Sequence, residues 1–249
     1  MKIKSAFQSE NFQLNQWIVS HFHEQYTEMT YVEPFSNDIN MVLEKEKSSV
    51  EVVNNLNQDI CNICFALRDE SKEFIRRLNL CKYCEETFER AKIKASKKLF
   101  EDYLDQAVNE FVLRKMSRGG NGKTFLKSKD LKFWEKNIKI CNELSRRIQE
   151  IFMFKKLAND VIQAFNSENT FLYCNPPRLQ ESNLADSLYS SDMTTQNHIE
   201  LSHLLNSFNG KAIISGYQSP LYNRLYKNWN MEKKKIENTK IVEVIWKNF

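Results

Sequence analysis

The sequence predicts an α/β protein with a mixed, mostly parallel sheet, a C-terminal β-hairpin and a helical insert. Three observations predict this class. Short β-rich runs alternate with helical patterns along most of the chain, which is typical of a parallel sheet covered on both faces. The alternation breaks at the C-terminus, where a β-rich run follows a polar turn, and a long central stretch has helical patterns without clear strands. With 249 residues, the chain can bury the core of such a domain.

Each predicted strand is rich in β-branched and aromatic residues and is bounded by turn residues. The predicted strands are Thr30–Phe35, Ser48–Leu56, Thr170–Cys174, Gly210–Tyr217 and, after the turn "ENT", Lys240–Trp246. The last of these is typical of a hairpin strand at a sheet edge, and the basic run Lys227–Lys235 before it is typical of a hairpin turn. Helical patterns cover Asn57–Asp69, Ser71–Leu78, Glu85–Met116, Lys129–Ile151 and Gln196–Ser207.

The central stretch without strands sets the predicted domain boundaries. It runs from about Glu85 to about Phe152. We therefore place an α/β domain over residues 1–84 and 153–249, interrupted by a helical insert over residues 85–152.

Composition excludes several classes of protein. Charged residues make up 27% and hydrophobic residues 41% of the chain, which indicates a globular protein. No apolar run approaches the roughly 20 residues that a membrane span needs, so no membrane partner is expected. The N-terminus "MKIKSAFQSENFQLNQW" lacks the apolar core of a signal peptide, so a cytoplasmic location is expected. Only five glycines occur, three of them at Gly119, Gly120 and Gly122, which weighs against a cofactor enzyme with a glycine-rich loop.

Five segments carry a resemblance to one family. They are "YVEPF" (Tyr31–Phe35), "LRKMSRGGNGKTF" (Leu113–Phe125), "LYSSDMTTQNHIEL" (Leu188–Leu201), "KAIISGYQSPLYNRLYKNW" (Lys211–Trp229) and "KIVEVIWKN" (Lys240–Asn248). Together they resemble the DNA adenine methyltransferases of the Dam type, which use S-adenosylmethionine to methylate the exocyclic amine of adenine. The resemblance covers nearly the whole chain and implies a Rossmann-like methyltransferase fold with a target-recognition insert. The implied activity is site-specific methylation of double-stranded DNA, of the restriction-modification type.

The cofactor positions implied by the resemblance are altered. Phe7 and Trp17 match the family's N-terminal loop, but its Gly-Gly-Lys is replaced by Ser9-Glu10-Asn11. The glycine-rich turn expected after Phe35 reads Ser36-Asn37-Asp38-Ile39, so Ile39 brings a β-branched side chain where glycine is expected. Asn55 stands where an aspartate normally accepts the ribose hydroxyls. The resemblance thus implies cofactor contacts from the positions Phe7, Trp17, Glu33, Phe35, Asn37 and Asn55.

The catalytic motif is altered too. The family's Asp-Pro-Pro-Tyr reads Asn175-Pro176-Pro177-Arg178, in which the two prolines end the preceding strand. Asn175 keeps a carbonyl oxygen that can accept hydrogen bonds from the target amine. The missing aromatic residue would stack on the flipped base, a contact worth about 1–3 kcal/mol. Arg178 can stack through its guanidinium face, but it brings a positive charge towards a sulfonium donor.

Two functions of different classes follow. One is adenine-N6 DNA methylation, weakened or lost through these changes, with Asn175 as the acceptor for the target amine and Asn55 at the ribose. The other is a catalytically inactive pseudo-methyltransferase that binds DNA or protein, for which an active methyltransferase homologue is a candidate partner.

Four cysteines form a CxxC…CxxC pattern with a spacing typical of tetrahedral zinc sites: Cys61, Cys64, Cys81 and Cys84. A break near residues 69–71, with Ser71 as N-cap, would fold this segment into a helical hairpin and bring the two pairs together. The alternative is that Cys61 and Cys64 are small buried residues on the packed face of a helix.

A basic segment, Arg114–Lys139, is the candidate DNA-binding region. It contains only two acids, and lysines with backbone N–H groups neutralise phosphates without reading the base sequence. The candidate contacts are Arg114, Arg118, Lys123 and Lys127. The alternative is a solvated loop, which is the usual environment of a charge run.

Overall fold

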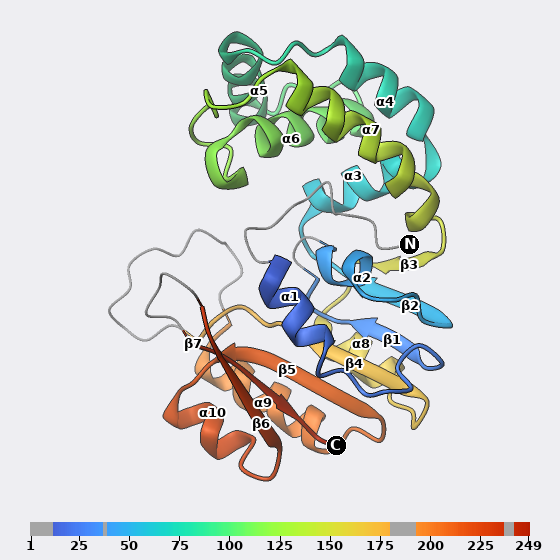
Figure 1. Cartoon of the computed structure of the whole chain (residues 1–249), viewed down its shortest axis with the longest axis vertical. Coiled ribbons are helices and arrows are strands. Elements are labelled where there is room, and N and C mark those ends of the chain that lie inside the picture. Colours follow the sequence, from blue (N-terminus) through green and yellow to red (C-terminus); the bar gives the residue numbers. More distant parts are fainter. Residues whose placement is uncertain (1–11, 37–38, 180–192, 237–241) are drawn as a thin grey trace. The chain divides into compact units, whose positions relative to one another are not determined.

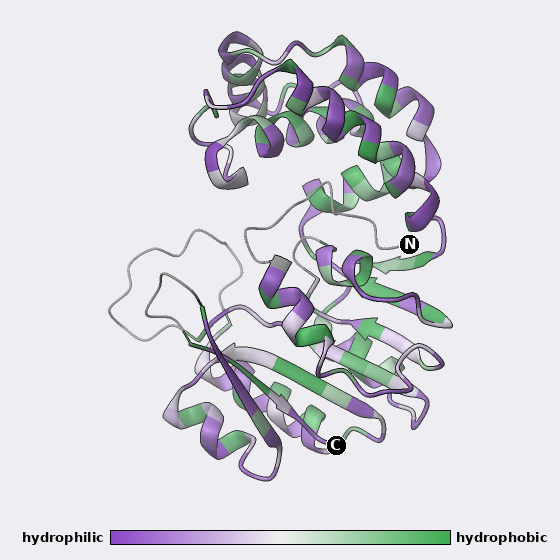
Figure 2. Cartoon of the chain, viewed as in Figure 1, coloured by the Kyte–Doolittle hydropathy of each residue, from purple (hydrophilic) through white to green (hydrophobic). Residues whose placement is uncertain are grey.

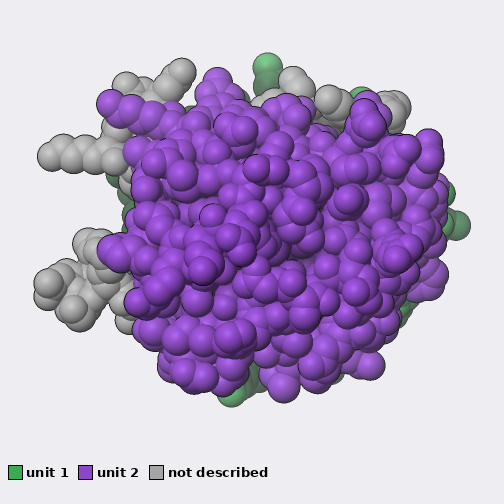
Figure 3. Space-filling view, turned by 90° about the horizontal axis from the view of Figure 1, so that it is seen from below, with its two compact units in different colours: residues 1–12, 56–151 green, residues 13–55, 152–249 purple. Residues whose placement is uncertain are grey.

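A computed structural model of the chain describes residues 12–36, 39–179, 193–236 and 242–249. The chain forms two compact units. The α/β unit contains Gln13–Asn55 and Phe152–Phe249, and the helical unit contains Leu56–Ile151. In Figure 3 the residues of the α/β unit form one continuous body, although they come from two separate stretches of chain.

Within the described residues, the sheet has seven strands in the order β3-β2-β1-β4-β5-β7-β6. The strands are β1 (Thr30–Glu33), β2 (Val50–Asn54), β3 (Ile151–Phe154), β4 (Thr170–Cys174), β5 (Lys211–Tyr217), β6 (Asn230–Lys235) and β7 (Val242–Lys247). β1 pairs in parallel with β2 and β4, and β4 pairs in parallel with β5. β7 is antiparallel to both β5 and β6, which confirms the predicted mixed sheet with a C-terminal hairpin (Figure 1).

The two faces of the sheet differ in chemistry. One face belongs to an apolar core in which Val32, Leu172 and Ile214 pack with Leu201 of α9 and Tyr222 of α10. The helices on this side are α8 (Ala158–Ala164), α9 (Thr195–Asn206) and α10 (Pro220–Leu225). The opposite face carries buried polar and aromatic residues: Tyr31, Glu33, Glu51, Tyr173 and Ser215. Two short helices accompany this second face, α1 (Phe12–Val19) and α2 (Asn40–Glu44) (Figure 1).

One predicted turn is in fact a strand. Residues Asn230–Lys235, within the basic run assigned to a hairpin turn, form β6 and pair with β7 along their whole length. Figure 2 shows β6 as hydrophilic, and its residues are mostly exposed. An edge strand buries no face completely, and lysines are common there because they oppose edge-to-edge association. The strand therefore lacks the apolar alternation by which strands are predicted.

The helical unit contains five helices within its described residues: α3 (Gln58–Asp69), α4 (Ser71–Leu80), α5 (Glu85–Lys97), α6 (Tyr103–Met116) and α7 (Leu131–Ile148). Its core is aromatic, with Phe111 edge-on to both Phe74 and Trp134 at ring-centre distances of 5.9 and 5.8 Å. α3 and α4 pack against α6 and α7, so this unit begins at Leu56, whereas the predicted insert begins at residue 85.

The helical pattern predicted over Glu85–Met116 is divided into two helices. α5 ends at Lys97, and Lys98 adopts the left-handed conformation (φ 53°) in which its N–H bonds to Ala95 O. Asp102 then caps α6 by accepting from the Asp105 N–H at 2.6 Å. The division thus follows from capping, which stops a helix without changing its apolar period. Among the described helices, none combines the length and apolar character required to cross a membrane.

Candidate functional site

The candidate site lies where parallel strands of the α/β unit end. β1 and β4 are parallel neighbours, so the residues at their carboxyl ends share one edge of the sheet. Glu33 is the last residue of β1, and Asn175 directly follows β4. Open α/β sheets bind their ligands in the crevice at this edge.

Glu33 is a buried acid bonded to a phenol. Its side chain is 3% exposed, and the Tyr31 hydroxyl donates to Glu33 Oε1 at 2.5 Å. Both residues face the same side of β1 because successive strand residues alternate. Burial, with the negative charge of Glu33, raises the pKa of Tyr31 well above its ordinary value, so Tyr31 remains a donor.

Asn175 is half-buried and bonded to its neighbours. Its Oδ1 accepts from Ser215 Oγ at 3.3 Å, and Ser215 Oγ lies 3.1 Å from the Tyr173 hydroxyl. Burial raises the pKa of Tyr173, so this chain of polar groups is neutral. An amide oxygen can still accept from an amine, but it binds a donor less strongly than the charged carboxylate of an aspartate would.

Arg178 is fixed against the edge formed by β5 and β7. It makes two hydrogen bonds to Glu243, each 3.0 Å long, and its guanidinium carbon lies 3.8 Å from the ring centre of Tyr217. The Glu243 side chain is only 1% exposed, and burial raises its pKa while the charge of Arg178 opposes that shift. The position at which the resemblance expects an aromatic residue thus neutralises a buried acid. The sequence did not predict a role for Glu243, although a single acid within the apolar run "KIVEVIW" indicates a buried charge that needs a partner.

Ile39 retains a glycine-like backbone conformation. Its φ of 53° and ψ of 8° are left-handed, a region in which a β-branched residue is a genuine outlier. The side chain is 1% exposed, so it fills space inside the unit that a glycine would leave open. Ile39 therefore keeps the backbone conformation of a glycine without the open space that a glycine would leave.

Asn54, the last residue of β2, bonds to the backbone of neighbouring strand ends. The Asn54 side chain donates to Pro34 O at 3.0 Å and Lys156 O at 2.9 Å, and it accepts from the Lys156 N–H at 2.8 Å. These bonds join the carboxyl ends of β1, β2 and β3. Asn55, the predicted ribose contact, is 6% exposed, and its N–H bonds to Phe154 O. Asn54 was missed because its partners are remote in sequence.

The other predicted cofactor residues are dispersed. Phe35 packs against the apolar core of the sheet, and Trp17 lies half-buried in α1 with its ring edge-on to His21. Phe7 and Asn37 lie outside the described residues. Their roles at a cofactor remain predictions.

Comparisons with known proteins find a likeness in structure only. No protein-family model matches the chain, and no curated protein matches it in sequence. Among solved structures, it is similar to an Escherichia coli protein, yhhF, described as a methyltransferase, with 7% identity, a TM-score of 0.37 and coverage of 94% of this chain and 81% of that one. It is also similar to a Clostridium difficile 630 protein described as a methylase, with 13% identity, a TM-score of 0.29 and coverage of 99% and 81%. TM-scores this low carry no argument about function.

The strand order carries the fold assignment. It is the doubly wound order 3-2-1-4-5-6 with one antiparallel strand, β7, inserted before the last. The α/β unit has a Rossmann-like, doubly wound fold. In this unit, Asn175 directly follows β4, at the carboxyl edge of the sheet.

The structure does not support the expected zinc site. The break near residues 69–71 is present, but α3 and α4 share the single residue Glu70 as their cap, which is too short for a helical hairpin. Cys61 and Cys64 are 1% and 0% exposed on the packed side of α3, while Cys81 and Cys84 follow α4. Among the residues described, no group of three or more His, Cys, Asp or Glu side chains is placed to hold a metal ion.

The predicted DNA-binding residues differ in their surroundings. Arg114 pairs along its own helix with Glu110, and Lys127 pairs with Glu85 at 3.2 Å. Arg118 and Lys123 are exposed and have no ion-pair partner among the described residues.

The loop that carries Arg118 and Lys123 is well organised. Its three glycines all have positive φ (64°, 70° and 69°). The Arg118 N–H bonds to Thr124 O at 2.9 Å, and the Gly122 N–H bonds to Ser117 Oγ at 2.8 Å. Arg118 and Lys123 thus stand on a loop held by its own hydrogen bonds.

Proposed function

We propose that this protein is a Dam-like pseudo-methyltransferase that binds double-stranded DNA and has lost methyl transfer. The observation that carries the proposal is Ile39, a buried β-branched residue in a left-handed turn at the position where the resemblance expects a cofactor-loop glycine. S-adenosylmethionine does not fit at Ile39, because a Cβ and its branches stand where a glycine would let a cofactor approach the backbone.

The base-binding side supports the same conclusion. A flipped adenine needs a flat partner, and the Arg178 guanidinium is already held at its edge by Glu243 and on one face by the Tyr217 ring. Moving Arg178 away from these partners to meet a base would leave a buried carboxylate without its counter-charge, which costs about 3–5 kcal/mol for a fully buried pair and less here because Arg178 is 38% exposed.

The DNA-binding part of the proposal rests on the basic loop of the helical unit. Arg118 and Lys123 are exposed cations on an organised loop, a suitable arrangement for contacts to phosphates. Such contacts give affinity without sequence specificity. A protein partner, such as an active methyltransferase homologue, is the alternative use of the retained scaffold.

Isothermal titration calorimetry with S-adenosylmethionine tests the loss of cofactor binding. No heat of binding is expected, and a Kd in the micromolar range would overturn the proposal. Transfer of a labelled methyl group to unmethylated double-stranded DNA is the second assay. Turnover that disappears in Asn175→Ala would establish instead an active enzyme, the candidate favoured by the amide oxygen retained at the end of β4.

Fluorescence anisotropy with a labelled DNA duplex tests DNA binding. Each lost phosphate contact lowers the slope of log K against log salt by about 0.9, so the double variant Arg118→Gln/Lys123→Gln should lose about 2 in slope. Lys227→Gln, which changes an exposed lysine of the α/β unit, is the matched control and should bind as the unaltered protein does. Equal slopes for all three proteins would exclude the loop as the DNA contact.

A further inference from the structure

The helical unit has an open groove of about 450 Å³ between α5 and α6. One wall is a stripe of α5 that includes Thr87, Ala91 and Lys94, spaced by one and two helical turns. The opposite wall is a matching stripe of α6 that includes Val108 and Val112. The volume falls within the range of small-molecule sites, about 300–1,000 Å³.

Apolar surface is left uncovered at the rim of this groove. Ile93 is 52% exposed and Leu99 is 59% exposed, and both line it. The valines of α6 also line it, but they are buried, with Val108 8% and Val112 2% exposed. A ligand with an apolar body would remove the rim surface from water, which is favourable.

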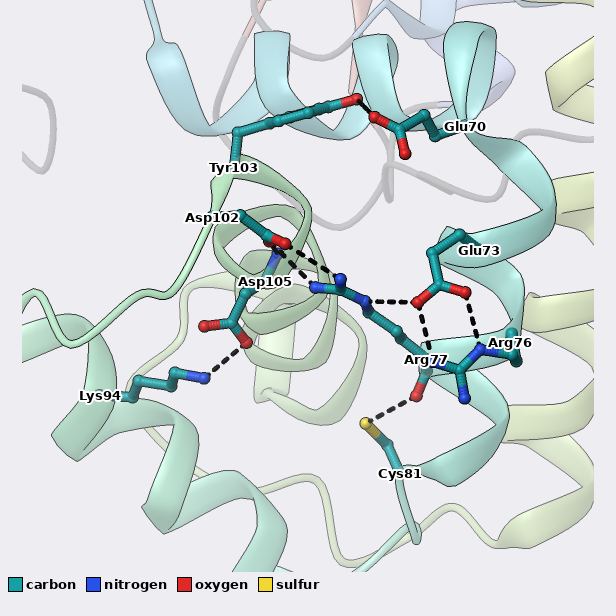
Figure 4. Close-up of polar contacts among 9 residues, drawn as sticks. All are labelled: Glu70, Glu73, Arg76, Arg77, Cys81, Lys94, Asp102, Tyr103 and Asp105. Atoms are coloured by element: carbon teal, nitrogen blue, oxygen red, sulfur yellow. Dashed lines mark hydrogen bonds and ion pairs between the residues drawn. The ribbon is translucent and has the colours of Figure 1, made fainter.

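Most polar groups of the groove already have partners. The Lys94 ammonium pairs with the Asp105 carboxylate (Figure 4). The same carboxylate also accepts from the Glu101 N–H at 3.1 Å. The Asn109 side chain donates to Ala91 O at 3.2 Å. These groups contribute no net charge to the groove.

Arg90 is the remaining cation. Among the residues described, it has no ion-pair partner, and it lines the groove. Its charge and that of Lys94 act on the Cys81 thiol, whose pKa is nevertheless raised because burial is the larger effect. Arg90 itself is an exposed residue of the groove lining. An apolar groove with one unpaired positive charge is complementary to an amphipathic anion.

We propose that the α5–α6 groove binds a small amphipathic carboxylate, with its head on Arg90 and its chain against Ile93 and Leu99, the exposed apolar residues of the lining. This site lies wholly within the helical unit and does not depend on the proposed DNA-binding function. The same chemistry could come from a free acid or from an anionic lipid in a membrane, and we assign the free acid because the groove is a local depression between two helices.

Calorimetric titration with decanoate tests the site, with decanol and decyltrimethylammonium as chain-matched controls of different charge. Decanoate should bind saturably at one site per chain and more tightly than either control. Arg90→Gln should weaken decanoate binding about tenfold, as expected for one charge-assisted hydrogen bond. Lys92→Gln, on the same helix but outside the groove lining, should leave binding unchanged.

A pair of substitutions at an exposed position tests the role of charge without risk to folding. Ile93→Glu and Ile93→Lys remove the same apolar side chain from the rim, so the glutamate variant should bind decanoate more weakly than the lysine variant. Circular dichroism would show that both variants remain helical.

Several results would overturn the assignment. Equal affinity for the three decyl compounds, or unchanged affinity in Arg90→Gln, would exclude a carboxylate head at this site. Co-sedimentation with phosphatidylcholine–phosphatidylglycerol vesicles that depends on Arg90 would replace the free acid by a membrane lipid. Binding of an acidic amphipathic peptide without any binding of decanoate would make the groove a protein-docking surface.

Discussion

The conformation of Ile39 leads to a prediction in which the usual order of two substitutions is reversed. Its φ of 53° lies in the left-handed region, where an L-residue is disfavoured by roughly 1–2 kcal/mol, whereas glycine pays no such cost. Elsewhere in helices, glycine is less stable than alanine by about 0.5–1 kcal/mol because it loses more backbone entropy. At Ile39 the left-handed strain favours glycine and the backbone entropy favours alanine. The strain is the larger effect, so glycine is favoured.

Both Ile39→Gly and Ile39→Ala should destabilise the protein, because they remove a side chain that is 1% exposed. The loss for isoleucine to alanine is typically 2–5 kcal/mol. Ile39→Gly should nevertheless be more stable than Ile39→Ala by about 0.5–1 kcal/mol, the difference between the strain relieved and the entropy lost. The measurement is the midpoint of equilibrium urea denaturation at constant m-value.

Val42 provides the control. It is buried within the same short helix, α2, and has no left-handed conformation, so Val42→Gly should be less stable than Val42→Ala by about 1 kcal/mol. The difference in stability between the glycine and the alanine variant should therefore have opposite signs at Ile39 and Val42. If Ile39→Ala were as stable as Ile39→Gly or more so, the assignment of a retained glycine turn would be refuted.

Three further predictions concern charged groups. Arg178→Met should destabilise the protein by about 1–3 kcal/mol, because Glu243 would be left buried without a counter-charge, and the loss should shrink in a Glu243→Gln background in a double-mutant cycle. Burial lowers the pKa of His198 in the folded state. The contribution of His198 to the free energy of unfolding is therefore full above the ordinary pKa of about 6.5, and it is lost as the pH falls through the lower pKa of the folded state. His198→Gln should remove this loss of stability at low pH, as measured by urea denaturation. In the helical unit, Arg77 joins two acidic residues and is 27% exposed, so Arg77→Ala should cost about 1 kcal/mol and lose this effect in high salt. Arg76 is 61% exposed, so Arg76→Ala should destabilise the protein less than Arg77→Ala does (Figure 4).

Much of the candidate site could be predicted because it depends on local signals. The strand Thr170–Cys174 is apolar and is stopped by two prolines, so Asn175 had to lie at a strand end. The environment of Arg178 could not be predicted in the same way. Its partner Glu243 is 65 residues further along the chain and comes next to it only through the pairing of β5 with β7.

The cysteine pattern shows the opposite failure, in which a local signal indicated a site that the fold does not assemble. The spacing of Cys61, Cys64, Cys81 and Cys84 suits zinc, but spacing does not state which side of a helix is buried or how sharply two helices turn. The packing of α3 against α6 decides which side of α3 is buried, and the one-residue junction at Glu70 decides how α4 follows α3.

By itself, the sequence determined the alternation of strands and helices, the C-terminal hairpin and the place of the altered motifs, because each depends on residues close together in the chain. The tertiary structure decided that β6 is a strand, that Glu243 holds Arg178, that Asn54 joins three strand ends and that Ile39 is left-handed and buried. These features depend on pairing and packing between distant segments. Such contacts arise when the chain closes its loops and buries its apolar surface, and a one-dimensional pattern does not record them.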